Sequence, residues 1–368
     1  MRERPLALQG GFTLIELIIS AVIGLLVLMA VSYAFVGGRH AYVLNSEMMR
    51  MQEDARAALE AIRRDMRMAA FHGCSELAQV EDASGMPGFS HLKDGFQVQN
   101  GSPDTEAPSK MADENPAPAL EIYGARANSA EANVLEEFVP ADGGAITVEG
   151  GKLASQLVAA APGRVLVSDC TGGLVMNFSG ASVPDTPGAS GSVKVSGGGG
   201  SRHLFVRGAQ VFLYPPPRAF FVGKPDDLGT WPEDAGSLRY HDGGIAAAGA
   251  GLDDSDVLVR GVEAFRVCVM DETLGVNRLV RWQDASDAVR QKATQAQIDL
   301  VLISSRDKVL PEAAKYDMKL CGEADPDRAI SYTRTDRRFR RLFSASVAIR
   351  NKITDVDKGG ESHDSLAD

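Results

Sequence analysis

The chain has 368 residues, with 38 lysines and arginines against 49 aspartates and glutamates, so its formal net charge is −11 at pH 7. A chain of this length can bury a substantial core and suits one large or two small domains. The acidic excess argues against a nucleic-acid-binding surface, which usually needs a basic patch. The segment TRTDRRFRR at 333–341 is a local candidate, but basic residues on the solvent face of a strand are the favoured interpretation.

An apolar run begins at Phe12 and continues to Val36, with Glu16 as its one charged residue. About 20 apolar residues, each rising about 1.5 Å in a helix, cross a hydrocarbon core of about 30 Å. A charged side chain in hydrocarbon costs several kcal/mol, so Glu16 needs an explanation. The ordinary readings are a membrane anchor with a stray interfacial carboxylate, a secretory signal peptide, or a buried core helix. The run exceeds the about 7–15 apolar residues of a signal peptide, and an all-round apolar helix at the N-terminus favours a membrane.

A second helical pattern follows Gly37 and Gly38, which mark a soft point between the two. Apolar residues recur there at spacings of three and four, which is typical of one stripe of an amphipathic helix: Leu44, Met48, Met51, Ala55, Leu59, Ile62, Met66 and Ala69. We expect this stripe to pack on a globular domain and the helix to end near FHGC at 71–74.

The rest of the chain alternates between polar segments and short strand patterns. Two segments read as insertions, a Pro-, Gly- and Asp-rich loop at 87–118 and a low-complexity linker or exposed hairpin at 179–201. A short helix is predicted at 284–293. Strands are predicted at 119–124, 145–149, 164–170, 174–178, 203–215, 219–223, 256–272, 296–307 and 340–351. The strand-rich second half favours an α+β fold with sheets packed on the amphipathic helix.

The four cysteines, Cys74, Cys170, Cys268 and Cys321, show no C-x-x-C and no zinc-finger spacing with histidine. The part beyond a single N-terminal span should lie outside the cytoplasm, where disulfides persist. Two disulfides are therefore expected, with three possible connectivities, and free buried thiols are the alternative.

The sequence offers no convincing catalytic or cofactor motif. It has no H-E-x-x-H and no G-x-S-x-G. GLDDSD at 251–256 reads as an acidic turn, because it lacks the glutamate of a calcium loop. SGGGGSR at 196–202 lacks the Lys-Ser/Thr of a phosphate loop. We expect no metal, no cofactor and no enzymatic activity.

The N-terminal stretch GGFTLIEL resembles the signal of type IV pilins and type II secretion pseudopilins. The resemblance implies a leader from Met1 to Gly11, cleavage between Gly11 and Phe12 by a prepilin peptidase, and N-methylation of Phe12. It also implies that Glu16, the fifth mature residue, pairs with the Phe12 amine of a neighbouring subunit. A carboxylate buried with a charged partner is tolerable where either charge alone is not, so the pair sets the stagger of the helices.

Three later segments resemble the closing part of PilW-type minor pilins: GVEAFRVCVMDE, AQIDLVLISSRD and RRFRRLFSASVAIRN. FHGC and VSDCTG resemble that family's cysteine-bearing segments, which implies a Cys74–Cys170 disulfide. Cys268 departs from the family pattern, so Cys268–Cys321 is expected as an extra, lineage-specific bridge.

The resemblance implies an α+β, type IV pilin-like fold with a long N-terminal helix on a strand-rich head. The expected organisation is a leader (1–11), a transmembrane and assembly helix (12–36), its amphipathic continuation (37–74), a head (75–351) with the two insertions, and a flexible tail (352–368).

The implied function is that of a minor pilin in a complex that primes pilus assembly and sits at the pilus tip. Its implied partners are other minor pilins, the major pilin, the prepilin peptidase, the inner-membrane assembly machinery and a tip adhesin. The head would lie in the periplasm before assembly and at the cell surface afterwards. The alternatives are a J-like tip pseudopilin of type II secretion and a tip adhesin that binds a ligand or DNA directly.

Overall fold

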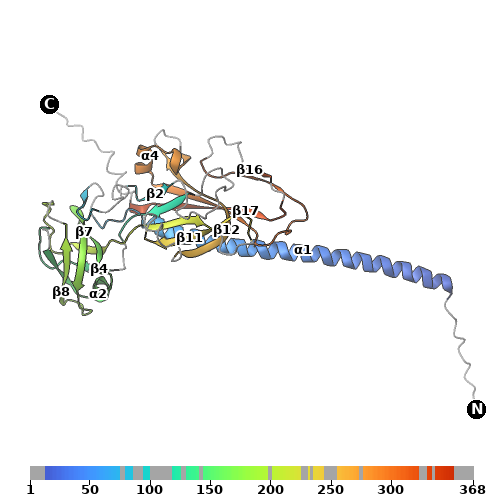
Figure 1. The fold of residues 1–368 in the computed structure, drawn as a ribbon, viewed down its shortest axis with the longest axis horizontal. Coiled ribbons are helices and arrows are strands. Elements are labelled where there is room, and N and C mark those ends of the chain that lie inside the picture. Colours follow the sequence, from blue (N-terminus) through green and yellow to red (C-terminus); the bar gives the residue numbers. More distant parts are fainter. Residues whose placement is uncertain are drawn as a thin grey trace, which may run out of the picture.

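The computed structural model describes residues 13–74, 79–85, 94–99, 118–125, 130–140, 144–197, 201–224, 231–232, 235–243, 255–272, 277–322, 330–333 and 336–351. The leader, most of the 87–118 insertion and the 352–368 tail lie outside these ranges. The prediction of a loop at 87–118 is wrong for Phe96–Gln99, which form a strand with Phe96 buried. The described elements form an α+β structure in which a long N-terminal helix meets a strand-rich head (Figure 1).

The helix α1 spans Leu14–Arg67 and dominates the shape of the molecule. It runs unbroken and gently curved through Gly37 and Gly38, where the sequence indicated a soft point (Figure 1). It ends because the chain turns at Ala70, whose φ is +57°. The apolar stripe ends in the same place: Met51, Ala55, Leu59, Ile62 and Met66 are all buried, as the amphipathic pattern predicts.

These α1 side chains pack on one face of a sheet that we call the proximal sheet. Its strand order is β17-β14-β12-β11-β10-β3-β2, with β13 added beside β12. The strands are β2 (Phe96–Gln99), β3 (Ala119–Ile122), β10 (Arg218–Gly223), β11 (Gly236–Asp242), β12 (Asp256–Asp271), β13 (Arg278–Arg281), β14 (Gln295–Ile303) and β17 (Arg340–Ala348). The 3-10 turn η4 (Trp282–Asp284) and the helix α4 (Asp287–Lys292) follow β13. A separate hairpin, β15 (Lys315–Met318) with β16 (Ile330–Thr333), follows β14.

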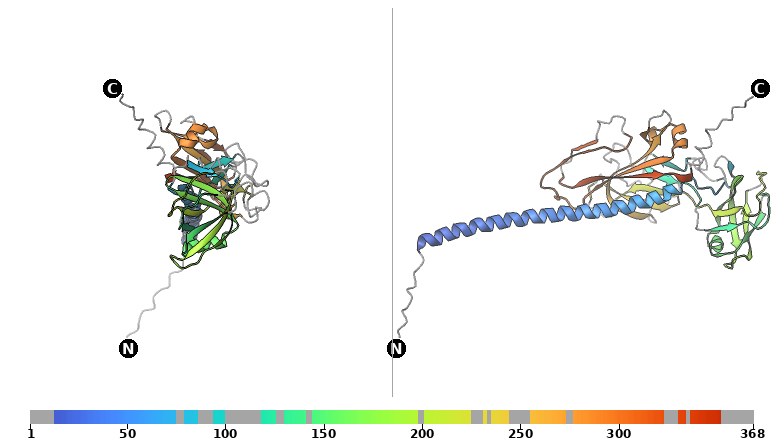
Figure 2. Two further views of the ribbon diagram at one scale, coloured as in Figure 1. Left: turned by 90° about the vertical axis from the view of Figure 1, so that its left-hand side faces the viewer. Right: turned by 180° about the vertical axis from the view of Figure 1, so that it is seen from behind.

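A second sheet, the distal sheet, lies beyond the C-terminal end of α1 (Figure 2). It is at the opposite end of the molecule from the N-terminal half of α1, which we call the free half of this helix. Its order is β4-β9-β6-β7-β8-β5, and β1 joins β7 in parallel. The strands are β1 (Val80–Asp82), β4 (Glu131–Asn133), β5 (Gly144–Glu149), β6 (Gly163–Asp169), β7 (Gly172–Ser182), β8 (Ser190–Ser196) and β9 (Gln210–Leu213). A bridge between Val134 and Val148 brings its two outer strands together, so the sheet curls into a barrel-like unit. The helix α2 (Lys152–Ala159) covers part of its core.

The expectation that the sheets pack on the amphipathic helix is therefore correct for the proximal sheet and wrong for the distal one. The core of the distal sheet contains no α1 residue, since α1 ends before it. The low-complexity segment at 179–201 is mostly the hairpin of β7 and β8, in which Val183, Val193 and Val195 are buried. Its alternating valines give this Gly- and Ser-rich segment one apolar face.

The two sheets meet at the segment that follows α1. Ala70 N–H donates to Tyr123 O at 2.8 Å, and Ala125 N–H donates to Phe71 O at 2.9 Å. The Phe71 ring packs edge-on against Phe212 of β9, with 5.3 Å between the ring centroids. The end of α1 is thus held between the proximal and distal sheets.

Candidate assembly site

The start of α1 is built by a capping box. Glu16 Oε2 accepts hydrogen bonds from Thr13 N–H and Thr13 Oγ1, both at 3.1 Å, while Thr13 is the N-cap residue. Such reciprocal bonds satisfy helix donors that otherwise lack a partner. The signal for this box, Thr-x-x-Glu ahead of an apolar run, is present in TLIE at 13–16, and the sequence analysis missed it. Gly11 and Phe12 lie outside the described residues.

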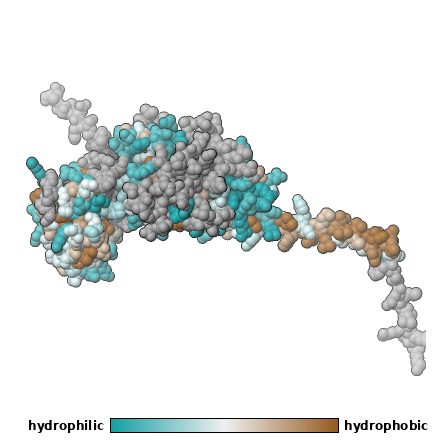
Figure 3. Space-filling model, viewed as in Figure 1, coloured by the Kyte–Doolittle hydropathy of each residue, from teal (hydrophilic) through white to brown (hydrophobic). Residues whose placement is uncertain are grey.

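The first half of α1 has a largely apolar surface, with Glu16 as its one charged residue, and nothing in the described chain covers it (Figure 3). Its large apolar side chains from Leu14 to Val36 are each between 51% and 84% exposed. The helix is long and apolar enough to cross a membrane, with a mean hydropathy of 2.8 in its most apolar window. Water does not tolerate an exposed apolar surface of this extent, so a bilayer or neighbouring helices must cover it.

The second half of α1 is fixed to the head by polar contacts at both ends. Near residue 47, the buried Glu47 carboxylate accepts from Ser305 N–H at 3.0 Å. At the other end, Arg218 Nη1 lies 2.5 Å from Asp65 Oδ1, and Asn351 Nδ2 donates to Ala69 O at 2.9 Å. These contacts make the apolar half of α1 a rigid extension of the head.

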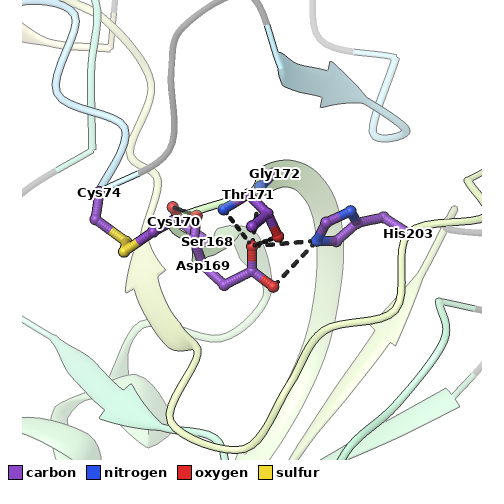
Figure 4. The surroundings of a disulfide bond; sticks show 7 residues. All are labelled: Cys74, Ser168, Asp169, Cys170, Thr171, Gly172 and His203. Carbon is purple, nitrogen blue, oxygen red and sulfur yellow. Dashed lines mark hydrogen bonds and ion pairs between the residues drawn. A yellow bond between two sulfur atoms is a disulfide. The ribbon is translucent and has the colours of Figure 1, made fainter.

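The structure joins Cys74 to Cys170 and Cys268 to Cys321, the two pairs named from the resemblance. The first disulfide links the segment after α1 to the turn between β6 and β7 (Figure 4). Gly73 is needed beside it, because its φ is +82° and a Cβ there would lie 2.5 Å from Ser168 Oγ.

The turn that carries Cys170 is organised by Asp169 (Figure 4). Its carboxylate accepts from Thr171 N–H at 2.8 Å and Gly172 N–H at 2.9 Å, and lies 3.0 Å from His203 Nε2. Burial by itself raises the pKa of Asp169, but the hydrogen bonds from Thr171 and His203 outweigh it and hold the pKa below its ordinary value. Asp169 and His203 are 34 positions apart, so no local sequence pattern indicates their pairing.

The second disulfide is flanked by buried polar contacts. Cys321 N–H donates to Asp299 Oδ2 at 2.6 Å, and Arg266 Nη1 donates to Cys321 O at 2.9 Å. The segment that carries Cys321 is therefore fixed to β12 and β14 by hydrogen bonds as well as by the disulfide.

The interpretation of DRRFRR as a solvent-facing basic strand is wrong for Arg340. Its side chain is 1% exposed and forms ion pairs with Glu263 at 2.8 Å and Asp336 at 2.7 Å. Although burial lowers the pKa of Arg340, the hydrogen bonds that it donates to Asp336 and Glu263 raise it overall. Arg338 donates to the carbonyls of Ser304 and Ser305, so this segment mainly serves internal contacts rather than a nucleic-acid surface.

No group of His, Cys, Asp or Glu side chains in the described ranges is arranged to hold a metal ion. Most of the acidic turn at 251–256 and the centre of the Gly-rich segment at 196–202 lie outside those ranges.

A cleft of about 440 Å³ opens in the distal unit where β4 and β5 diverge from their bridge. Its wall includes the start of α2 and several polar side chains, with Asn133 Nδ2 donating across it to Glu149 Oε2 at 3.3 Å. The polar side chains are Glu131, Asn133, Glu149, Lys152, Asp185 and Gln210.

Among solved structures, the chain is similar to a type IV-like pilin from Thermus thermophilus, with 14% sequence identity and a TM-score of 0.20. The similarity covers 54% of this chain and 92% of that one. No protein-family model and no curated protein matches the chain. The described residues themselves place a long helix, exposed and apolar in its first half, on a strand-rich head, and this architecture fits a pilin-like fold.

Proposed function

We propose that this chain is a minor pilin, similar to the PilW type, and that its role is structural rather than enzymatic. In this proposal it enters the inner membrane as a prepilin, loses residues 1–11 and joins other minor pilins in a complex that primes a pilus. The observation that carries the proposal is the uncovered apolar half of α1, which begins at the Glu16 capping box and is rigidly joined to the head.

A tip position is supported by the bulk of the head. The distal unit lies beyond the end of α1, so the head extends well past the helix that would pack in a filament core (Figure 2). A subunit of this shape fits an end of a filament more readily than a repeating shaft. A J-like tip pseudopilin of a type II secretion system would share the N-terminal motif and the strand-rich head. It is the alternative structural role.

The experiment is recovery of partners from the membrane. A tagged full-length chain should cross-link through the first half of α1 to other pilins and start at Phe12 after processing. A chain that keeps its leader and is recovered alone would contradict the proposal. Partners that are secretion components would favour the pseudopilin.

The cleft of the distal unit supports a second candidate, a tip protein that binds a ligand directly. Its volume lies in the range of about 300–1,000 Å³ typical of small-molecule sites, and it lies in the unit farthest from the free half of α1. Glu149→Gln with Asn133→Ala should abolish binding of a surface ligand if the cleft is used. Unchanged adhesion of cells that carry this variant would contradict ligand binding in the cleft, and only the structural role would remain.

A further inference from the structure

The position of the head on α1 fixes how close it lies to a membrane, an inference that rests on the proposed membrane insertion of α1. The first charged residue after Glu16 is Arg39, so the hydrocarbon boundary falls before it. The first buried side chain of α1 is Glu47, which is about 12 Å farther along the helix at about 1.5 Å per residue. The headgroup layer of one leaflet accounts for about 5–7 Å of that distance.

The part of the head that lies there is the loop at 304–310, which we call the proximal loop. Its position is set by Glu47, which accepts from Ser305 N–H at 3.0 Å and from Ser305 Oγ. Both ends of the loop are hydrogen-bonded to the segment that leads into β17. Ser304 N–H donates to Phe339 O at 2.8 Å, and Leu310 N–H donates to Arg337 O at 2.9 Å. The chain that follows β14 also reaches along α1 toward its free half (Figures 1 and 2).

The exposed surface of the proximal loop carries two basic side chains although the whole chain is acidic. The Arg306 side chain is 69% exposed and forms an ion pair with Glu47 at 3.5 Å, and Lys308 is exposed at the tip with a φ of +61°. Asp307 lies between them, and its carboxylate accepts from Lys308 N–H at 2.8 Å and Arg337 N–H at 3.3 Å. Exposed Arg39 on α1 adds a further positive charge on the membrane side.

We propose that the proximal loop, with Arg306 and Lys308 as its contact residues, binds the anionic headgroups of the bilayer while the subunit is in the membrane before assembly. The remaining gap of about 5–7 Å is shorter than the Debye length of about 8–10 Å at physiological salt, and long basic side chains and the ordinary tilt of a membrane helix shorten it further. Charge attraction of this kind acts on basic residues next to an anionic surface. The contact holds the head against the membrane, and extraction of the subunit into a filament breaks it.

The test is hydrogen exchange of the full-length chain in nanodiscs made of zwitterionic lipid alone or with anionic lipid. Backbone amides at 304–310 should exchange roughly threefold or more slowly with anionic lipid, and high salt should remove this protection. Lys308→Gln, which leaves the Arg306–Glu47 ion pair in place, should weaken it, and Arg306→Gln with Lys308→Gln should remove it. Glutamine is chosen because a new carboxylate would lie next to Glu47.

The matched control is Arg202→Gln with Arg207→Gln, which removes two exposed positive charges from the distal unit and should leave the protection intact. Equal exchange in both lipids by an inserted chain would overturn the headgroup contact and leave the pilin proposal standing. Protection that survives in the Arg306→Gln, Lys308→Gln variant would also overturn it. Failure of the chain to insert would overturn both.

Discussion

Asp65 near the end of α1 and Arg218 at the first position of β10 form an ion pair whose side chains are only 9% and 10% exposed. The pair lies where α1 leaves the proximal sheet, so it fixes the direction of the helix relative to the head. Arg218→Met should lower the free energy of unfolding by about 3–5 kcal/mol, because it removes a guanidinium group that lies 2.5 Å from a buried carboxylate.

Denaturant unfolding of the detergent-solubilised chain measures this effect. Asp65→Leu combined with Arg218→Met should recover much of the loss, since no charge is then buried. Equal losses in the single and double variants would show that the pair is not what holds the end of α1.

The Cys74–Cys170 disulfide should contribute about 2–4 kcal/mol to stability, because it closes a long loop between α1 and the β6–β7 turn. Cys74→Ser with Cys170→Ser should therefore loosen the distal unit more than the proximal sheet, whose core lies on α1. Peptide mapping without reductant checks the pairing first. Free thiols or crossed pairs would refute it.

Asp169 should make the β6–β7 turn sensitive to acid. Its folded pKa is held below the ordinary value, so its stabilising effect is complete above about pH 4 and is lost as the pH falls through the folded pKa. Asp169→Asn should cost about 1–3 kcal/mol at pH 7 through its lost hydrogen bonds, and the difference from wild type should shrink below pH 4.

Urea midpoints at pH 7 and pH 3 give this comparison. Asp287→Asn is the control, because that side chain is 89% exposed. This substitution should leave the urea midpoint unchanged at both pH values. If the urea midpoints of wild type and Asp169→Asn differed by the same amount at both pH values, Asp169 would not be the source of the acid sensitivity.

Processing is predicted from the residues ahead of the apolar run. Gly11→Ala should slow or block maturation, and the mature wild-type chain should begin at Phe12. N-terminal sequencing of the chain from the cell envelope decides this, and any other start is incompatible with the prediction.

Local sequence patterns predicted the elements that depend on residues close together in the chain. They did not predict contacts between residues that are far apart in the chain. The spacing of Met51, Ala55 and Ile62 predicts the buried stripe of α1, because helical periodicity is local. The burial of Arg340 could not be predicted, since its partner Glu263 is 77 positions away. The α2 helix was missed because it has only 8 residues and no side-chain cap.

Two misses concern the site itself and differ in kind. The capping box of Thr13 and Glu16 was readable from the sequence, but the charge in the apolar run drew the explanation toward assembly alone. The Asp169–His203 pair was not readable, because only the fold of the distal sheet brings the two residues together.

We propose that Glu16 serves assembly through its charge and not only through its capping bonds. The two roles separate in Glu16→Gln, because glutamine can complete a capping box but carries no charge. Thr13→Ala is the converse variant, since it removes the cap and keeps the carboxylate.

The decisive measurement is co-purification of these two variants with the other pilins, alongside a count of surface pili. We expect Glu16→Gln to be made, inserted and processed but to lose partner recovery by about a hundredfold, because a neighbour's buried amine is left unpaired. Thr13→Ala should assemble nearly normally. Normal recovery and piliation with Glu16→Gln, together with failure of Thr13→Ala, would contradict the claim and leave Glu16 as a helix cap.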